Sequence, residues 1–403
     1  MTKDHMIPLD EALHIVDETL AGVKPIGETV AVRQAIGRVL LTDQTSRLDL
    51  PPFDKAAMDG YAVLADDVRD EYRVLETIAA GQTGRSRLVS GCCVKIMTGA
   101  AVPIGTGRVI MVEHTEQHGE VVKILRHDEA SNVCRQAEDV RRGQTVLSAG
   151  TTLGVPEVTH LIACGLADVE VARRVNVAII STGDELIDNP ERLTPGKIMN
   201  TNGPMLAALA NEYGLIMVSE KVLPDDREAT VEGIRRAVAN ADMVVLSGGV
   251  SAGDLDLVSD ALVDAELTVR FSRVAVKPGA PMTYAFGRNK AVFGLPGNPV
   301  TAFLMFHVFV LRAVARLTGS RDLVREYTFP LARDWKRRKT HRTDYVPCRF
   351  THDGTLEPVG FHGSAHLAAL CRADGFFIVP VGRVKVHAGA PLSFVSIGRV
   401  GAL

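Results

Sequence analysis

The spacing of apolar residues predicts a helix at the start of the chain and an alternating α/β region later. In residues 8–20 the apolar positions Leu9, Leu13, Val16 and Leu20 recur at helical spacing, so we predict an amphipathic helix. Further along, short apolar runs alternate with helical patterns, which is typical of βαβ units in a parallel, doubly wound sheet. The predicted strands are 175–180, 215–223, 243–246, 269–276 and 291–295, and the predicted helices are 204–213, 227–240, 255–265 and 300–317.

Two other regions have the composition of β-strands. Between residues 51 and 142, short apolar runs such as 61–64 and 121–125 are separated by Gly, Pro and Asp. The last stretch, 327–403, returns to short extended runs separated by turns. We therefore predict a separate β-rich domain in the first region and a small all-β domain at the end.

Length and composition are those of an ordinary globular protein with several domains. At 403 residues the chain is too long for one hydrophobic core, so we expect about two to four domains. The hydrophobic fraction is 46% and the charged fraction is 23%. The formal charge of −3 does not attract the protein to nucleic acid or to an anionic membrane. Any site that binds an anion must therefore be a local feature of the structure.

The cysteine pattern and the longest apolar stretches indicate a cytoplasmic protein. The 6 cysteines show no CxxC spacing, and the neighbours Cys92 and Cys93 cannot bridge easily, so we interpret all of them as reduced thiols. The N-terminal residues lack the apolar core of a secretory signal. The apolar stretch 302–311 is about half of the ~20 residues that span a bilayer. We expect neither nucleic acid nor a membrane as a partner.

Acidic side chains follow the predicted strands of the α/β region at several points. In an open α/β sheet the carboxyl ends of the strands converge on one crevice, so we expect these side chains to meet there. Carboxylates from different strands can share a hard cation such as Mg²⁺, although helix N-capping explains Asp184 or Asp254 equally well in isolation. The residues are Asp184, Glu185, Asp225, Asp226, Asp254 and Asp256.

Glycine-rich turns lie beside these carboxylates. The glycines of the segment 247–253 let backbone N–H groups approach an anion at the positive end of the next helix, and a turn without a ligand is the alternative. The segments 277–279 and 295–300 are plain turns on local grounds, but Lys277 is a point charge suited to a phosphate or another oxyanion. The combination predicts an enzyme that acts on phosphorylated metabolites.

Other charged residues are less informative. The basic run 336–339 and the nearby Arg342 are typical of a solvated face, whereas Arg349 is isolated in a strand-like segment and could fork onto an oxyanion. Asp59 and Thr98 have the local pattern of loop residues. The 12 histidines show no metal-ligand spacing, and the chain has neither a nucleotide-binding P-loop motif nor a nucleophile elbow, which disfavours kinase-like and hydrolase functions.

A series of short motifs occurs in a specific order along the chain. They are 52–62 (PFDKAAMDGYA), 97–100 (MTGA), 181–186 (STGDEL), 200–202 (NTN), 225–226 (DD), 247–256 (SGGVSAGDLD), 277–279 (KPG), 295–300 (LPGNPV), 363–364 (GS) and 373–375 (ADG). In this order they resemble the molybdopterin molybdenumtransferase family, which includes bacterial MoeA and the E domain of gephyrin. The resemblance covers residues 8 to 400, nearly the whole chain.

The resemblance implies an elongated subunit with a doubly wound, MogA-like molybdopterin-binding domain, a linker domain, an inserted β-rich domain and a C-terminal β-barrel-like domain. The expected boundaries, in that order, are 1–26 plus 175–322, 27–45 plus 143–174, 46–142, and 323–403. It also implies a homodimer in which Asp59 reaches the crevice across the subunit interface. Molybdopterin adenylyltransferase and molybdoenzyme maturation proteins are the further partners that it suggests.

The implied reaction takes adenylylated molybdopterin and molybdate as substrates, cleaves the pyrophosphate bond, releases AMP and leaves molybdenum on the dithiolene. By resemblance, Glu185, Asp226 and Asp256 would hold Mg²⁺ on the pyrophosphate. The implied catalytic residues are Asp59, Glu185, Asp226, Asp256 and Lys277. The implied substrate-binding residues are Thr98, Thr182, Gly183, Asp184, Asn202, Ser247, Gly248, Gly249, Ser251, Gly253, Pro278, Gly279, Pro296, Gly297, Asn298, Pro299, Arg349 and Ser364, of which Arg349 and Ser364 would join Lys277 around molybdate.

The chain departs from the family pattern at some positions. Ala280 stands where the family pattern Lys-Pro-Gly-Lys-Pro has its second lysine, and Cys134 stands where an arginine is usual, next to a possible substitute in Arg135. A charge-assisted contact that is not replaced costs about 1.5–3 kcal/mol, which is roughly ten- to hundredfold in affinity. Two alternatives therefore stay open: a non-catalytic protein that binds the pterin nucleotide, and an enzyme that uses tungstate.

Overall fold

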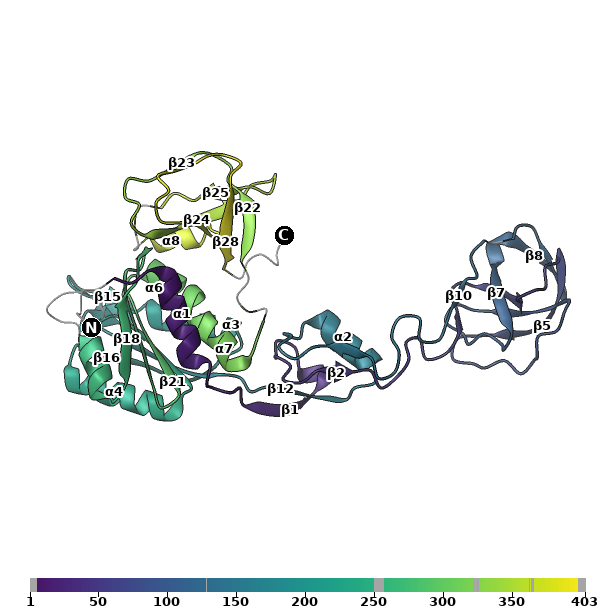
Figure 1. Cartoon of the computed structure of the whole chain (residues 1–403), viewed down its shortest axis with the longest axis horizontal. Helices are drawn as coiled ribbons and strands as arrows, with labels where there is room; N and C mark the ends of the chain where they lie inside the picture. The colour runs from purple at the N-terminus through teal and green to yellow at the C-terminus, as the bar shows by residue number, and fades with distance from the viewer. Residues whose placement is uncertain are drawn as a thin grey trace.

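The computed structural model shows an elongated subunit (Figure 1). The α/β part and the C-terminal β part lie next to each other at one end, the β-rich part lies at the other end, and a narrow linker part joins them. The structure describes residues 6–127, 129–249, 257–321, 323, 326–361, 363 and 366–397.

A six-stranded sheet forms the centre of the α/β part. Its strands are β13 (Asn176–Thr182), β16 (Ile216–Leu223), β17 (Met243–Ser247), β18 (Thr268–Arg273), β20 (Pro281–Gly287) and β21 (Lys290–Leu295). The order is β16-β13-β17-β21-β20-β18, in which the first four strands are parallel and β20 is antiparallel to both of its neighbours. Because β16 and β17 lie on opposite sides of β13, the chain reverses direction across the sheet there, which makes a topological switch point at the carboxyl ends of β13 and β17.

Helices cover both faces of this sheet. They are α1 (Leu9–Leu20), α3 (Asn202–Glu212), α4 (Arg227–Asn240), α5 (Leu257–Asp264), α6 (Pro299–Met305) and α7 (Leu311–Thr318). In β13, Val177 and Ile179 belong to a core shared with α1, α3, α6 and α7, whereas Ala178 and Ile180 belong to a core shared with α4 and α5. Successive side chains of a strand point to opposite faces, so a strand buried on both faces is apolar throughout. The prediction of a doubly wound domain is confirmed.

The predicted long helix at 300–317 is confirmed, with one irregularity. The run Pro299–Thr318 consists of α6, a π-helical segment at Phe306–Val310, and α7. This run of 20 residues contains an 18-residue window with a mean hydropathy of 1.7 and could span a membrane by length and composition, but 72% of that window is buried inside the fold. We therefore interpret it as the core helix of the α/β part.

The C-terminal part is built on a second sheet. Its strands are β19 (Val276–Lys277), β22 (Tyr327–Pro330), β24 (Thr343–Phe350), β25 (Leu356–Pro358), β26 (Gly375–Val379) and β28 (Pro391–Ser396), with β23 (Trp335–Lys336) paired to β27 (Lys385–Val386) and a short helix α8 (Leu367–Leu370) beside them. The strand β19 comes from the segment between β18 and β20 of the other sheet, and its Lys277 is aligned with Asp344 of β24. The backbone therefore places Lys277 where the two parts meet.

The remaining parts are simpler. The β-rich part contains β4 (Gly60–Leu64), β5 (Glu71–Ile78), β6 (Cys92–Ile96), β7 (Thr106–Met111), β8 (Thr115–His118) and β9 (Val121–Ile124) in one sheet, and β3 (Lys55–Ala56) paired to β10 (Val133–Cys134). The linker part contains β1 (Gly27–Ala31) paired to β12 (Asp168–Ala172), β2 (Gln44–Thr45) paired to β11 (Thr145–Leu147), and the helix α2 (Val155–Ala163). Both parts have buried apolar clusters of their own. The domain boundaries given above stay a prediction.

Candidate active site

The two strands that meet at the switch point of the α/β sheet end in residues with hydroxyl side chains. Thr182 is the last residue of β13 and Ser247 is the last residue of β17, and Ser181 is aligned with Ser247 across the two parallel strands. All three side chains are buried. They lie where open α/β sheets bind ligands, as predicted for residues 182 and 247.

Asn202, the first residue of α3, is fixed in one orientation at this switch point. Its Nδ2 atom donates to Ser247 Oγ at 2.6 Å and to the backbone oxygen of Gly297 at 2.7 Å. The loop after β21, which contains Gly297, is therefore tied to the end of β17. With its nitrogen occupied in this way, the amide leaves its oxygen as the atom that can accept a further hydrogen bond.

Buried polar atoms without a partner gather here. Among the described residues, Ser181 Oγ, Thr182 Oγ1 and Asn202 Oδ1 are buried and make no hydrogen bond within the chain. Leaving such an atom unpaired costs about 1–3 kcal/mol. A polar ligand that entered the crevice would satisfy these atoms, and this supports the prediction of a binding site better than the glycines alone.

The loop after β17 requires glycine at one position in particular. Gly248 has a φ of +96°, and a Cβ atom there would lie 2.4 Å from the backbone oxygen of Thr182. The two loops therefore approach each other more closely than any side chain permits. Ser251, Gly253, Asp254 and Asp256 of the same predicted loop lie outside the described residues.

Two of the predicted carboxylates join neighbouring loops. Asp184 accepts from the backbone N–H of Asp225 at 3.2 Å, and Asp225 accepts from that of Asp184 at 3.3 Å. Lys197 Nζ donates to the backbone oxygen of Asp184 at 2.6 Å. The carboxylates of the first two strand ends are thus brought together, as predicted, and both are exposed.

The predicted magnesium ligands are only partly described. Asp226 is the N-cap of α4, where its Oδ1 accepts from the Ala229 N–H at 2.7 Å, and the Glu185 carboxylate lies over Gly183. Within the described residues, no group of three or more His, Cys, Asp or Glu side chains is placed to hold a metal ion. Since Mg²⁺ usually takes one or two carboxylates together with substrate phosphates and water, two acidic groups fit its donor chemistry, and the magnesium site stays a prediction.

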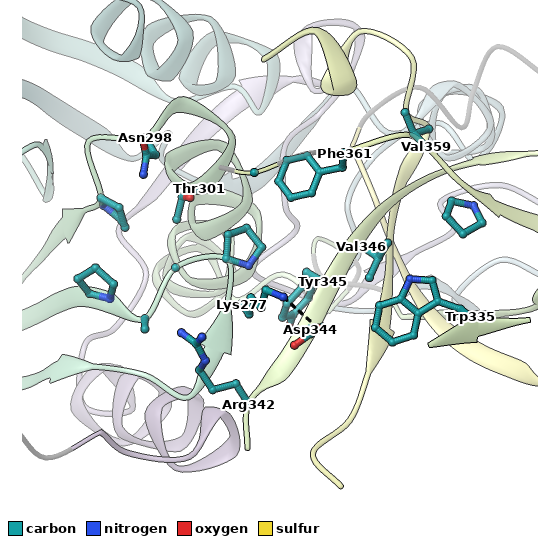
Figure 2. Close-up of a pocket in the computed structure, with 17 residues that line it drawn as sticks. Lys277, Asn298, Thr301, Trp335, Arg342, Asp344, Tyr345, Val346, Val359 and Phe361 are labelled. Carbon is teal, nitrogen blue, oxygen red and sulfur yellow. Dashed lines mark ion pairs between the residues drawn. The ribbon is translucent and has the colours of Figure 1, made fainter. Parts of the chain in front are cut away.

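A cavity lies between the α/β part and the C-terminal part (Figure 2). It has a volume of about 480 Å³. The predicted residues Lys277, Pro278, Gly279, Pro296 and Asn298 line one side of it. The other side comes from the C-terminal part and includes Trp335, Arg342, Asp344, Tyr345, Val346 and Phe361.

A buried ion pair fixes the acidic residue of this cavity. Arg337 Nη1 lies 2.8 Å from Asp344 Oδ1, and the two residues are 7% and 4% exposed. Lys277 Nζ lies 4.0 Å from Asp344 Oδ2, and Figure 2 draws this pair as a dashed line. The prediction of a solvated face for the run 336–339 is therefore wrong at Arg337, which donates to three backbone oxygens of the surrounding loops as well as to Asp344.

Arg349 is not among the residues that line this cavity. It stands five residues after Asp344 in β24, and side chains separated by an odd number point to opposite faces of a strand. Its Nε and Nη2 atoms lie 3.1 and 2.8 Å from Glu357 Oε2, and this pairing lowers the pKa of Glu357. Ser364 lies outside the described residues.

Asp59 and Thr98 lie together in the β-rich part. Asp59 Oδ1 accepts from the backbone N–H and from the hydroxyl of Thr98, both at 2.7 Å, and these bonds lower the pKa of Asp59. Asp59 directly precedes β4, whose sheet is at the opposite end of the molecule from the crevice (Figure 1). The single chain does not bring these two residues to the other predicted site residues. Arg135, in the same part, pairs with Asp54 at 2.7 Å.

Family comparisons cover nearly the whole chain. Family models match at 7–165 (MoeA N-terminal region, domain I and II), 178–316 (probable molybdopterin binding domain) and 328–397 (MoeA C-terminal region, domain IV). A relative from Staphylococcus epidermidis, named molybdopterin molybdenumtransferase, is 31% identical over 396 residues, which are 95% of this chain and 94% of the relative. The chain belongs to the molybdopterin molybdenumtransferase family.

Other relatives agree with this membership. A molybdopterin molybdenumtransferase from Staphylococcus aureus is 30% identical and covers 98% of this chain and 96% of its own length. The crystal structure of the molybdopterin biosynthesis MoeA protein from Pyrococcus horikoshii OT3 has a TM-score of 0.84 at 29% identity, and covers 98% of this chain and 100% of that chain. The predicted fold class and the class of enzyme, a transferase of molybdenum cofactor biosynthesis, are confirmed at the level of this family.

For this molybdopterin molybdenumtransferase family member, sequence reasoning missed several cavity residues. Trp335, Arg342, Asp344 and Phe361 were not among the predicted site residues, although all of them line the cavity. One signal was present: Arg342 and Asp344 stand two apart directly before the strand-like segment 345–350, and residues two apart in an extended chain lie on one face.

Proposed function

We propose that the chain inserts molybdate into adenylylated molybdopterin and releases AMP. The strongest support for this proposal is that the loop after β21 contributes residues to both the crevice and the cavity. Pro296 and Asn298 line the cavity, and Gly297 between them is bonded to Asn202 in the crevice. A substrate with a nucleotide end and a pterin end would therefore lie across this loop, with one end in the crevice and the other in the cavity.

In this proposal the crevice holds the phosphate and nucleotide end. Ser181, Thr182 and Asn202 offer buried polar atoms without a partner, and the approach of Gly248 to Thr182 leaves backbone rather than side chains at the loop surface. Mg²⁺, held by Glu185 and Asp226 with Asp256, would neutralise charge on the pyrophosphate. In this proposal the crevice residues position the pyrophosphate bond that breaks, and Asn202 holds the loop after β21 against the end of β17.

The cavity holds molybdate and the end of the pterin that receives it. A volume of about 480 Å³ is within the range of sites for small organic ligands and exceeds what a tetrahedral oxyanion fills. Lys277 and Arg342 supply positive charge, and Trp335 and Phe361 supply apolar surface suited to a flat ring system. Molybdate and the dithiolene end of the pterin would then meet beside Lys277.

The same proposal includes a cytoplasmic homodimer. In the single chain Asp59 is at the far end of the molecule from Lys277 (Figure 1). A second copy that lies alongside in the opposite direction would bring its Asp59 to this crevice, and a twofold interface generates two such sites. Asp59 would then help to position the attacking oxygen or the metal.

Release of AMP tests the function. Purified protein is incubated with adenylylated molybdopterin, Mg²⁺ and molybdate, and AMP is quantified by chromatography. We expect AMP release that requires molybdate, and Lys277→Ala should reduce it while Lys336→Ala, an exposed lysine of the basic run, leaves it unchanged. If no AMP appears at saturating substrate, the protein is not this transferase.

The non-catalytic alternative retains one supporting observation, which is Ala280 in place of a second lysine. It predicts tight binding of the pterin nucleotide without turnover. The other alternative is an enzyme that uses tungstate. It is tested with tungstate in place of molybdate in the AMP assay, because the two oxyanions have the same charge and nearly the same size.

A further inference from the structure

Ala280 leaves one wall of the cavity without the charge that the family resemblance leads us to expect. Its side chain lines the cavity and is 6% exposed. A tetrahedral dianion beside Lys277 alone would keep half of its charge uncompensated in a cavity whose other lining residues are mostly proline, glycine, aromatic or aliphatic. Another cation is therefore needed if an oxyanion binds here.

Arg342 is placed to be that cation. It directly precedes β24, and the peptide group that joins it to Thr343 is fixed, because Arg337 Nη1 donates to the Arg342 carbonyl oxygen at 2.8 Å and the Thr343 N–H donates to Ala275 O at 2.9 Å. Arg342 and Asp344 are two apart and both line the cavity. In Figure 2, Lys277, Asp344 and Arg342 are all drawn in the lower half of the view.

The charges of the cavity wall do not balance. Asp344 is neutralised by its buried pairing with Arg337 at 2.8 Å, and Lys277 is at the outer limit of an ion pair with it at 4.0 Å. Within the described part of the chain, the Arg342 guanidinium has no ion-pair partner. Arg349, the arginine expected by resemblance, is already paired with Glu357. The wall therefore carries surplus positive charge at Lys277 and Arg342.

We propose that Arg342 is the second oxyanion-binding residue of this cavity and takes the place of the absent lysine at position 280. This inference rests on the proposed function and names a specificity-determining residue for it. The planar guanidinium donates two parallel N–H bonds to two oxygens of a tetrahedral oxyanion, while Lys277, from the neighbouring strand β19, contributes a point charge. Arg342 enters from the C-terminal part, so the oxyanion is held between the two parts of the subunit.

The test removes the positive charge at position 342 and adds one at position 280. Molybdate binding to the full-length protein is measured by calorimetry for wild type, Arg342→Met, Ala280→Lys and the double variant. We expect Arg342→Met to weaken binding roughly ten- to hundredfold. The double variant should regain most of the wild-type affinity, because a lysine at 280 restores a cation that Arg342→Met removes.

Controls separate charge from folding. Arg338→Met alters an exposed arginine of the same basic run and should leave the molybdate affinity unchanged, and Arg342→Lys should retain an intermediate affinity. Each variant is checked by thermal unfolding. Unchanged affinity in Arg342→Met, or a loss in Arg349→Met instead, would overturn the inference, as would absence of molybdate binding by the wild type.

The inference and the proposed function can fail separately. If AMP release is absent but molybdate binding still depends on Arg342, the site is correct and the reaction is wrong. If AMP release and molybdate binding are both normal in Arg342→Met, the reaction stands and Arg342 is not the second cation.

Discussion

The Asn202 side chain joins three segments that are distant in the sequence. Its amide nitrogen bonds Ser247 Oγ and Gly297 O, and its buried oxygen has no partner within the described residues. Removal of the amide would release the loop after β21 and remove an acceptor for the ligand. Both effects act on the crevice rather than on the stability of α3, whose other buried residues are apolar or glycine.

We expect Asn202→Ala to weaken binding of AMP, the product proposed to leave this crevice, roughly ten- to hundredfold. The affinity is measured by calorimetry. Asn211→Ala, at an exposed position near the end of the same helix, is the matched control and should bind AMP like the wild type. Equal affinities in all three proteins would mean that Asn202 is a structural residue only.

The buried ion pair Arg337–Asp344 holds the acidic residue that lines the cavity. Since both side chains are more than nine-tenths buried, Arg337→Met leaves an uncompensated carboxylate, which costs about 3–5 kcal/mol. The free energy of unfolding, measured in urea, should fall by that amount, whereas Arg338→Met at the exposed neighbour should change it by about 0.5 kcal/mol or less. A small effect at Arg337 would show that solvent reaches Asp344.

Sequence reasoning found some site residues and missed others for a physical reason. Thr182, Ser247 and Lys277 each stand at or next to the end of a strand, so the topology of the sheet predicts their position. Arg337 is in the basic run 336–339 and Arg342 is near it, and such a run is usually solvated. Arg337 is buried where it donates to backbone oxygens of the loop between β26 and β27, which contains Pro380 and Arg383, and that packing has no local signature.

At the scale of elements, the apolar runs predicted most of the α/β part. The predicted helix at 227–240 coincides with α4, and the predicted strand at 243–246 lies within β17. The strand β20 was not predicted, and the predicted strand at 269–276 ends at Arg273 in β18, after which Val276 begins a strand of the other sheet. Hydrophobic period alone does not say which of two sheets an apolar run joins.

The two glycines that face each other across the crevice loops give a paired prediction. A methyl group at Gly248 would lie 2.4 Å from the Thr182 backbone oxygen, whereas one at Gly297 would meet only the Gly248 Cα at 3.8 Å. Gly248→Ala should therefore lower the melting temperature by several degrees and weaken AMP binding, and Gly297→Ala should be tolerated. Similar melting curves for the two variants would mean that the loops separate freely.

The π-helical segment contains a histidine that makes stability depend on pH. Burial lowers the pKa of His307 to about 4. In the unfolded chain its pKa is near 6.5, so between these values the unfolded state binds more protons, and stability falls as the pH drops from about 6.5 toward 4. His307→Gln should flatten the urea-unfolding profile over that window, and His352→Gln, at an exposed position, should not. Parallel profiles for all three proteins would contradict this.

At the scale of the whole molecule, the elongated shape separates Asp59 from the crevice (Figure 1). The proposed dimer makes a prediction that no single-chain mechanism shares. Asp59→Asn and Lys277→Ala homodimers should each lose AMP release. A mixture of the two, allowed to exchange subunits, should regain about a quarter of the wild-type rate, because half of the dimers then contain one intact site out of two. If mixing restores nothing, Asp59 does not act across an interface.

In the proposed reaction one substrate occupies the crevice and the cavity together, so that release of AMP and attachment of molybdenum are one event. The most direct measurement is the molar ratio of pterin-bound molybdenum to AMP, determined by elemental analysis and chromatography after a single turnover. We expect a ratio near one for the wild type, with both products lost together in Lys277→Ala. AMP release without molybdenum on the pterin would contradict it.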